Sequence, residues 1–342
     1  MEQVKQAVIM VGGKGTRLLP LTETAPKPSL PVLDRPCLKY LIKSFADSGI
    51  TQIFLACGYK SDVLKKAIGD GSDLGVEIIY SDEETPLGTG GAMKQLESRF
   101  DPVFAAANGD AFIDIDVREQ IDLHLRTGAS ITIALTQVDD PWNYGIARVE
   151  SDGRITEFKD KPKPEEVFSN LINAGVYVVN RSVLAHVPEQ QFFDFSMNLV
   201  PIITNKGERV QGYKLTKGIW IDVGRPHDLI RANLVAAERY GAELGNKPDS
   251  GVETRGPVYL GNNSVVTQSK VESSVILGSC HVNNCSLMES LIMDGCDLEG
   301  VTVVNSILGK GCTVSTGAVI KDSVLRDGTI VPEGALVERR VG

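Results

Sequence analysis

The chain has 342 residues, with 35 Lys and Arg against 44 Asp and Glu and a net charge of -9. This length allows two domains with hydrophobic cores of their own. The balance is acidic, and the acidic residues are scattered rather than gathered in a tail. The composition therefore argues against a nucleic-acid partner, because phosphate backbones bind clustered Lys and Arg. No stretch approaches the roughly 20 apolar residues that cross a bilayer, and the first apolar run is too short for a secretory signal. We expect a soluble, cytoplasmic protein without a membrane partner.

Between residues 4 and 240, short apolar runs alternate with helix-length amphipathic stretches. Strands are expected over 4–10, 52–57, 76–80 and 102–107, and helices over 37–49 and 60–70. This order predicts a Rossmann-like, mostly parallel α/β sheet. Ligands bind beyond the carboxyl ends of the strands in such sheets, so the residues that follow the strands should form the site.

The periodicity of the sequence changes after a helical stretch at 225–241. The polar segment that follows has no periodicity, so we expect a first domain over 1–240, a linker over 241–257 and a second domain over 258–342. A six-residue register runs through Ile307, Thr313, Val319, Leu325, Val331 and Val337, and two glycine pairs repeat in step, Gly311/Gly317 and Gly328/Gly334. This period predicts a hexapeptide parallel β-helix, with a β-sandwich as the alternative. The register slips between 281 and 304, where we expect irregular coils.

The six cysteines form no CxxC pair, and only four histidines could complete a zinc site. We therefore expect small, buried, reduced thiols.

The segment VGGKGTRLLPLTETAPKPSLPV, residues 11–32, directly follows the first expected strand. Its glycines allow backbone N–H groups to approach phosphate oxygens: Gly12, Gly13 and Gly15. The pattern is neither a Walker A loop nor GxGxxG, whose third glycine would be Leu18. Arg17 and Lys27 supply positive charge for a departing pyrophosphate, and Pro26 and Pro28 hold Lys27 stiffly. Taken singly, each of the two could instead be a solvated surface charge.

GGKGTRLLPLT followed by PKPSLPV resembles the sugar-phosphate nucleotidyltransferase family, and later motifs extend the resemblance over residues 4–240. VGG and SDEETPLGTGGAM (81–93) are most similar to mannose-1-phosphate guanylyltransferases that carry a C-terminal left-handed β-helix. The resemblance implies transfer of a nucleoside monophosphate from a nucleoside triphosphate to a sugar 1-phosphate, with release of pyrophosphate and GDP-mannose as the product. It implies that the nucleotide contacts Gly12, Gly13, Gly15, Thr16, Glu83 and Gly88.

The choice of base depends on Glu83, which the resemblance places at the base. A carboxylate accepts hydrogen bonds, and guanine presents N1–H and N2–H₂ donors side by side, whereas thymine and uracil offer one donor between two acceptors. Neighbouring Glu84 could take this role, and Glu83 could be a solvated turn residue.

Two carboxylates follow apolar strands, Asp110 in AAANGDAFIDID and Asp222 in GIWIDVGRP. The resemblance makes both magnesium ligands and, with Arg17 and Lys27, catalytic residues. Mg²⁺ prefers oxygen ligands and keeps several waters, so two carboxylates plus phosphate oxygens are sufficient. The resemblance places neither Asp114 nor Asp116 at the metal. Taken alone, Asp222 would be a carboxylate at a turn or helix N-terminus.

The segments NYGIARVESDGRITEFKDKPKP and NLINAGVYVVN form the sugar-phosphate site in the family. The resemblance implies Lys161 at the phosphate, Asn173 and the Gly145 backbone at ring hydroxyls, and Asp160 as a further acceptor. The family usually has Glu before this Lys-Pro pair. Asp160 is shorter by a methylene, which leaves the identity of the sugar open.

The phosphate of the sugar is already an anionic nucleophile, so the hypothesis is direct in-line attack on the α-phosphorus without a protein base. The alternatives are a glucose-1-phosphate thymidylyl- or uridylyltransferase and a catalytically silent regulatory subunit. A further alternative is a bifunctional enzyme whose β-helix transfers acyl groups, which generally needs a histidine base. His281 is the single histidine beyond the linker. The flat stacked faces of a β-helix favour a homo-oligomer.

Overall fold

The computed structural model describes residues 3–342, and the chain divides into two compact units. The first unit contains the chain up to Gly13 and Leu38–Trp220. The second contains Lys14–Cys37 and Ile221–Gly342, so a short N-terminal segment belongs with the C-terminal part of the chain. None of the helices formed by residues 3–342 combines the length and apolar character needed to cross a membrane.

The first unit is built on a mixed sheet in the strand order β10-β9-β11-β6-β1-β4-β5, with β8 joined to β11 and β12 joined to β8. The half that contains β6, β1, β4 and β5 is parallel, as predicted, whereas β11 runs antiparallel to β6, β8 and β9. The strands of this unit are β1 (Gln6–Val11), β4 (Gln52–Cys57), β5 (Glu77–Asp82), β6 (Val103–Asn108), β7 (Ala111–Asp114), β8 (Ile131–Gln137), β9 (Gly145–Val149), β10 (Ile155–Asp160), β11 (Leu171–Asn180) and β12 (Val210–Lys214).

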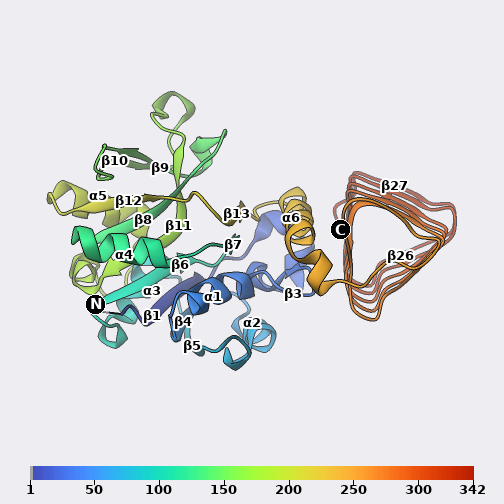
Figure 1. Ribbon diagram of the computed structural model, residues 1–342, viewed down its shortest axis with the longest axis horizontal. Helices are drawn as coiled ribbons and strands as arrows, with labels where there is room; N and C mark the ends of the chain where they lie inside the picture. Colours follow the sequence, from blue (N-terminus) through green and yellow to red (C-terminus); the bar gives the residue numbers. More distant parts are fainter. Residues whose placement is uncertain (1–2) are drawn as a thin grey trace. The chain divides into compact units, whose positions relative to one another are not determined.

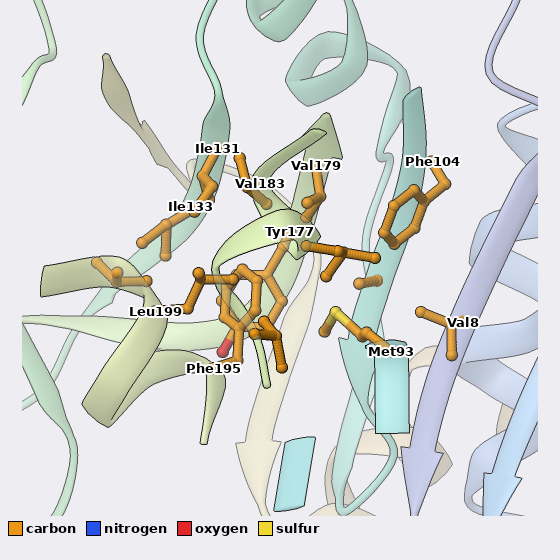
Figure 2. Packing of buried hydrophobic residues seen from close by; sticks show 14 of the residues in the cluster. Val8, Met93, Phe104, Ile131, Ile133, Tyr177, Val179, Val183, Phe195 and Leu199 are labelled. Atoms are coloured by element: carbon orange, nitrogen blue, oxygen red, sulfur yellow. The ribbon is translucent and has the colours of Figure 1, made fainter. Parts of the chain in front are cut away.

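Both faces of this sheet are buried, because consecutive residues of β1, β4 and β6 enter different hydrophobic clusters. Val8 belongs to one cluster and Ile9 to the other. Figure 2 shows the first cluster, in which Tyr177 and Phe195 pack with ring centroids 4.6 Å apart. Helices supply the covering layers: α1 (Leu38–Asp47), α2 (Ser61–Ile68), α3 (Gly88–Gln95), α4 (Arg118–Thr127) and α5 (Val200–Asn205).

The second unit begins with the hairpin β2 (Pro31–Val32) and β3 (Arg35–Pro36), and β13 (Ile219–Asp222) leads the chain back into it. Helix α6 (Pro226–Leu244) follows, and β14 starts at Glu253. The segment expected to be a linker, 241–257, is therefore shorter in the structure, because α6 and β14 take up its two ends.

The C-terminal strands form the predicted parallel β-helix, whose coils stack as a triangular prism (Figure 1). Each side of the prism is a parallel ladder. The strands are β14 (Glu253–Leu260), β15 (Val265–Thr267), β16 (Lys270–Ile276), β17 (His281–Asn283), β18 (Ser286–Met288), β19 (Leu291–Ile292), β20 (Asp297–Glu299), β21 (Thr302–Val304), β22 (Ile307–Leu308), β23 (Thr313–Val314), β24 (Val319–Lys321), β25 (Val324–Leu325), β26 (Ile330–Val331) and β27 (Leu336–Glu338).

The coils between 281 and 304 are regular, so the expectation of irregular coils there is wrong. Val282 pairs with Leu298, sixteen residues later, whereas Val314 pairs with Val331, seventeen residues later. Coils of these lengths cannot keep a strict six-residue step on every side. The interior cluster therefore contains Leu308, Val314 and Ile320, each one residue after a position of the predicted register, and a five-residue step then returns it to Leu325 and Val331. Ile307 of the predicted register is also buried, although it does not belong to this cluster.

The glycine pairs of the repeat lie at turns with left-handed backbone: Gly311 (φ +65°), Gly317 (φ +76°), Gly328 (φ +70°) and Gly334 (φ +66°). The six cysteines are buried and reduced, as predicted.

A ladder of buried serines links successive coils inside one corner: Ser274, Ser290, Ser306 and Ser323. The Ser306 hydroxyl donates to the Val304 carbonyl at 2.7 Å and accepts the Ser323 N–H at 3.0 Å. Each hydroxyl thus bonds two backbone groups, the N–H of the equivalent residue in the next coil and a carbonyl of its own coil that also accepts a backbone N–H. These bonds matter because buried polar groups without partners are costly.

We predict that Ser306→Ala lowers the free energy of unfolding by about 1–3 kcal/mol, because the buried Ser323 N–H and Val304 carbonyl both lose this partner. Urea unfolding of the full chain followed by circular dichroism measures the change. Ser286, exposed on neighbouring β18, provides the matched control Ser286→Ala, which should match the wild type. Equal stability of the two variants would contradict the structural role of the ladder.

Candidate active site

The predicted site residues fall into two groups, one in each unit, and each group is described by itself. The first unit contains Gly12, Gly13, Glu83, Gly88, Asp110, Gly145, Asp160, Lys161 and Asn173. The second contains Gly15, Thr16, Arg17, Lys27 and Asp222.

Asp110 lies at the carboxyl edge of the sheet because Gly109 packs directly against β1. The Gly109 N–H donates to the Met10 carbonyl at 2.9 Å, and a Cβ on Gly109 would come within 2.5 Å of Val11 Cγ1. Strands β1 and β6 are parallel neighbours, so Gly12 and Gly13 leave β1 at the edge where Asp110 leaves β6. All three residues are exposed, in contrast to the strands that precede them.

Glu83 follows β5 at the same edge, and its backbone N–H donates to the Cys57 carbonyl at 2.9 Å. Its Oε2 accepts the Leu87 N–H at 3.1 Å, which fixes the carboxylate in a tight turn. Burial raises the pKa of Glu83, and the Leu87 hydrogen bond opposes that rise. Glu84 is exposed, so the half-buried Glu83 is the better placed of the two for recognition.

Gly88 begins α3 with left-handed backbone, at φ +72°, and the segment around Phe193 runs against it. A Cβ on Gly88 would lie 2.8 Å from the Phe193 carbonyl oxygen. That oxygen accepts the Gly90 and Gly91 N–H groups at 2.8 and 3.0 Å. These two N–H groups of the helix N-terminus are therefore satisfied within the protein, and glycine at 88 is required by the close approach.

Gly145 and Asp160 face each other across the antiparallel pair β9 and β10. A Cβ on Gly145 would lie 3.3 Å from Asp160 Oδ1 and 2.6 Å from the Phe158 ring, so only glycine fits. Burial raises the pKa of Asp160, the Lys161 charge opposes that rise, and the Asp194 carboxylate adds to it. Asp160 thus lies half-buried beside Gly145, another residue predicted to contact the sugar.

Lys161 is exposed and has left-handed backbone, with φ +43°, which is strained for a side chain with a Cβ. Its N–H donates to the Tyr144 carbonyl at 2.9 Å, which holds the turn in place. The Asn173 amide donates to the Tyr177 hydroxyl at 2.8 Å and to Ser196 Oγ at 2.9 Å, and its Oδ1 accepts the Gly175 N–H. These bonds lock the orientation of the amide.

The segment 191–199 was missed by the sequence analysis although it joins two parts of the site. Asp194 accepts a hydrogen bond from the Thr89 hydroxyl in α3 at 3.0 Å and caps the π-helical turn Phe195–Leu199. Ser196 in this turn contacts Asn173. The sequence signal was present, since an Asp that precedes an apolar turn is a favourable cap, but it carries no family motif.

In the second unit, Arg17, Lys27 and Asp222 come together. Lys27 is only 8% exposed, and its Nζ lies 3.5 Å from Asp222 Oδ1. A Cβ on Gly224 would lie 3.2 Å from Asp222 Oδ2 and 3.3 Å from Arg17 Nη2, so both charged groups approach the same side of Gly224. Lys27 is therefore not the solvated surface charge that the isolated residue could have been.

Gly15 lies in a tight turn that packs against Lys27 of this group. It has left-handed backbone, with φ +62°, and a Cβ there would lie 3.1 Å from Lys27 Cβ. Its carbonyl accepts the buried Thr22 hydroxyl at 3.0 Å. Thr16 and Arg17, which follow in a short 3-10 helix, are exposed. The segment thus folds back on itself, so that its two cationic residues approach the same carboxylate.

Comparison with known families identifies the family of the chain. Residues 6–239 match the family model described as nucleotidyl transferase, and residues 283–341 match the model described as GlmU-like, C-terminal hexapeptide. The chain belongs to the nucleotidyl transferase family. The first match covers more than half of the chain, and it includes every residue of both groups.

Curated relatives in this family act on sugar phosphates. The chain is 35% identical to a mannose-1-phosphate guanylyltransferase of Mycobacterium tuberculosis, over 66% of this chain and 63% of the relative. It is 30% identical to a UTP--glucose-1-phosphate uridylyltransferase of Synechocystis, over 78% of this chain and 71% of the relative. It is 33% identical to the mannose-1-phosphate guanylyltransferase catalytic subunit beta of Drosophila melanogaster, over 78% of this chain and 70% of the relative. The chain thus spans somewhat less than two thirds of the first of these relatives.

A solved structure from Bacillus anthracis, assigned as a glucose-1-phosphate thymidylyltransferase, has the same fold. The TM-score is 0.62 at 22% identity, over 72% of this chain and 98% of that one. At this identity the likeness establishes the nucleotidyltransferase fold and leaves the substrates open.

Members of this family generally depend on a divalent metal. Within residues 3–342, no cluster of three or more His, Cys, Asp or Glu side chains could hold such an ion. Asp110 and Asp222 are single carboxylates, and Asp116 is occupied by Arg118 through hydrogen bonds of 2.9 and 3.1 Å. Each of the Asp110 and Asp222 carboxylates, taken by itself, is a type of ligand that a divalent metal ion accepts together with water and substrate phosphates.

Proposed function

We propose that this nucleotidyl transferase moves a nucleoside monophosphate from a nucleoside triphosphate to a sugar 1-phosphate and releases pyrophosphate. The observation that carries the proposal is the Arg17, Lys27 and Asp222 group. A lysine this deeply buried needs a partner of opposite charge, and here that partner is the Asp222 carboxylate. Arg17 is the second cation of the group. A triphosphate and its metal ion match such a mixed set of charges.

In this mechanism, a phosphate oxygen of the sugar 1-phosphate attacks the α-phosphorus of the nucleotide in line. The new oxygen–phosphorus bond forms as the bond to the β-phosphate oxygen breaks, and pyrophosphate leaves with that electron pair. The nucleophile carries its own negative charge, so no protein base is required. Catalysis consists of positioning and charge neutralisation.

The residues divide this work. Arg17 and Lys27 neutralise the charge that accumulates on pyrophosphate, and Lys161 holds the phosphate of the sugar. Gly12, Gly13, Gly15 and Thr16 provide backbone contacts to the triphosphate, with Gly88 at the nucleoside. Asp110 and Asp222 would hold Mg²⁺, which supplies charge neutralisation to the reacting phosphates when bound. Gly145, Asp160 and Asn173 orient the sugar ring.

The substrate pair is GTP and mannose 1-phosphate. Two of the relatives compared are named mannose-1-phosphate guanylyltransferases, including one named a catalytic subunit. A carboxylate has room for several hydrogen bonds, so Glu83 can accept from Leu87 and still receive the two adjacent guanine donors. Uracil or thymine would place a carbonyl oxygen against this carboxylate, which is repulsive.

Release of pyrophosphate from GTP, dTTP, UTP, CTP and ATP, each with mannose 1-phosphate or glucose 1-phosphate, tests the proposal. We expect the highest kcat/KM for GTP with mannose 1-phosphate. Asp110→Asn is the control that links the activity to this chain, and it should lose at least about two orders of magnitude. A preference for UTP or dTTP with glucose 1-phosphate would refute the substrate pair, and no release from any pair would refute the reaction class.

The raised pKa of Glu83 gives a pH-dependent prediction. Acceptance of guanine donors requires the deprotonated carboxylate, so KM for GTP should rise as the pH falls into the acidic range, and the rise should begin at a higher pH than an exposed glutamate would give. Glu83→Gln cannot titrate and serves as the control, measured at saturating sugar phosphate. Titration of the GTP phosphates affects both proteins alike. Parallel pH profiles would remove Glu83 from base recognition.

We also propose that the protein is a cytoplasmic homo-oligomer that associates through its β-helix. Ile330 and Leu336 are 75% and 69% exposed on β26 and β27, in the C-terminal coil. Exposed apolar side chains on one coil favour self-association. Sedimentation velocity should give a mass above that of one chain, and a monomer at micromolar concentration would count against this proposal.

A further inference from the structure

The segment Lys14–Cys37 interrupts the first unit in sequence but folds as part of the second, together with α6 and the β-helix. This segment carries Gly15, Arg17 and Lys27, the residues proposed to contact the triphosphate. The contacts that hold it therefore come from the C-terminal part of the chain. They are concentrated at two places, one on each side of Lys27.

The first contact place is the turn between β25 and β26. Arg326 forms a bidentate pair with Glu23, with Nε 2.9 Å from Oε2 and Nη2 3.0 Å from Oε1. The Thr24 hydroxyl donates to Asp327 Oδ2 at 3.0 Å, while the other Asp327 oxygen accepts the Lys310 N–H at 2.8 Å. Asp327 is thus fixed by the β-helix itself. A bidentate pair constrains both distance and orientation.

The second contact place is the turn after β14. The Tyr259 hydroxyl donates to Asp34 Oδ2 at 2.5 Å, and the Asn262 N–H reaches the same oxygen at 3.3 Å. Gly261 permits this approach, because a Cβ there would lie 2.8 Å from Asp34 Oδ1. Buried Asn233 of α6 adds a bond of 2.8 Å from the Leu33 N–H to its Oδ1.

Both turns lie on the same edge of the β-helix. Leu260, Ile276, Ile292, Leu308 and Leu325 pair in succession along one side, so Gly261 and Arg326 occupy equivalent corners four coils apart. Four strand spacings of about 4.8 Å separate the two corners by about 19 Å. Residues 23–34 therefore follow this edge, which we call the clamp edge (259–262 and 326–327), and are attached at both ends.

The two attached places lie close in sequence to the residues predicted to contact phosphate. Thr22 is next to Glu23, is buried, and donates to the Gly15 carbonyl at 3.0 Å. Lys27 lies between the two attachments and is held beside Asp222. Given the proposed function, we infer that the clamp edge positions Arg17 and Lys27 for pyrophosphate, with Glu23, Thr24, Arg326 and Asp327 as positioning residues of the reaction.

Loss of the Arg326–Glu23 pair should affect catalysis much more than the stability of the fold. Arg326 and Glu23 are 56% and 40% exposed, and exposed ion pairs contribute little to the free energy of unfolding. Loss of the pair should therefore leave the fold intact and increase the freedom of the segment. Misplacement of a charged group by about 1 Å can cost about 100-fold in rate, so an effect on catalysis can be large even where the effect on stability is small.

The test compares Arg326→Ala with Arg255→Ala in the full chain. Arg255 also lies on the β-helix, on β14, and its ion-pair partner at 3.7 Å is Glu272 of neighbouring β16, a residue outside the clamp edge. We expect Arg326→Ala to lower kcat/KM for the nucleotide and for pyrophosphate in the reverse reaction by about 10-fold or more. KM for the sugar phosphate and the Tm should remain at wild-type values. Arg255→Ala should match the wild type in every measurement.

Two further variants distinguish positioning by the clamp edge from a general loss of stability. Glu23→Arg combined with Arg326→Glu restores the pair with reversed charges and should recover most of the lost activity. Thr24→Val removes the hydrogen bond from the Thr24 hydroxyl to Asp327 without changing the size of the side chain. It should also lower kcat/KM for the nucleotide. A fall in Tm with equal losses for both substrates would instead show a structural role and overturn the inference.

Hydrogen–deuterium exchange of residues 14–37 measures how firmly the clamp edge holds this segment, and it requires no enzymatic assay. Exchange should increase in Arg326→Ala and remain unchanged in Arg255→Ala. If the wild type releases no pyrophosphate, the proposed function fails while this readout still judges the clamp. Unchanged exchange in Arg326→Ala would overturn the inference even if the enzyme is active.

Discussion

The burial of the Lys27 ammonium beside the Asp222 carboxylate is the interaction on which the second unit depends. A lysine 8% exposed would lose much of its hydration without compensation, so the chain must keep a carboxylate within reach at all times. This requirement ties a residue near the N-terminus to one that follows β13. It explains why Lys14–Cys37 folds with the C-terminal part of the chain rather than with its sequence neighbours.

The same constraint defines what the β-helix does within one chain. Its regular coils provide a straight edge on which equivalent corners recur at every strand spacing, and such an edge holds a neighbouring segment more rigidly than a loop could. Asp34 and Glu23 use corners four coils apart. Stability of the coils comes from their interior and from the serine ladder, so the exposed corners are available for positioning.

Sequence analysis recovered the parts of the fold that short-range patterns determine. The strands β1, β4, β5 and β6 and the helices α1 and α2 were predicted because apolar runs alternate with amphipathic stretches over short distances. The β-helix was predicted from its period, but the interior register was displaced by one residue through 320. Coils of sixteen and seventeen residues contain five-residue steps, and a fixed period of six cannot reveal where those steps occur.

The site was harder to predict, for a different reason. Single residues such as Asp110 and Gly145 could be linked to a function through motifs. The contacts that position them, of Gly109 with Val11 and of Gly145 with Phe158, involve residues that carry no signal of their own. Segment 191–199 and the clamp edge depend on pairs more than one hundred residues apart, such as Thr89 with Asp194 and Glu23 with Arg326. Long-range pairs of this kind leave no periodic trace in one sequence.

The family alone leaves open which base and which sugar the protein selects. Buried carboxylates bear on both choices. Glu83 and Asp160 are both partly withdrawn from water, and burial raises the pKa of each. A carboxylate kept in such a place loses hydration that a substrate with matching donors can replace, so discrimination is strongest where the wrong substrate leaves the carboxylate unpaired. On the proposed function, Glu83 is suited to adjacent N–H donors and Asp160 to sugar hydroxyls. Specificity in this protein would then depend on two half-buried acids, whereas the cationic groups around Lys27 would act on phosphates that every candidate substrate shares.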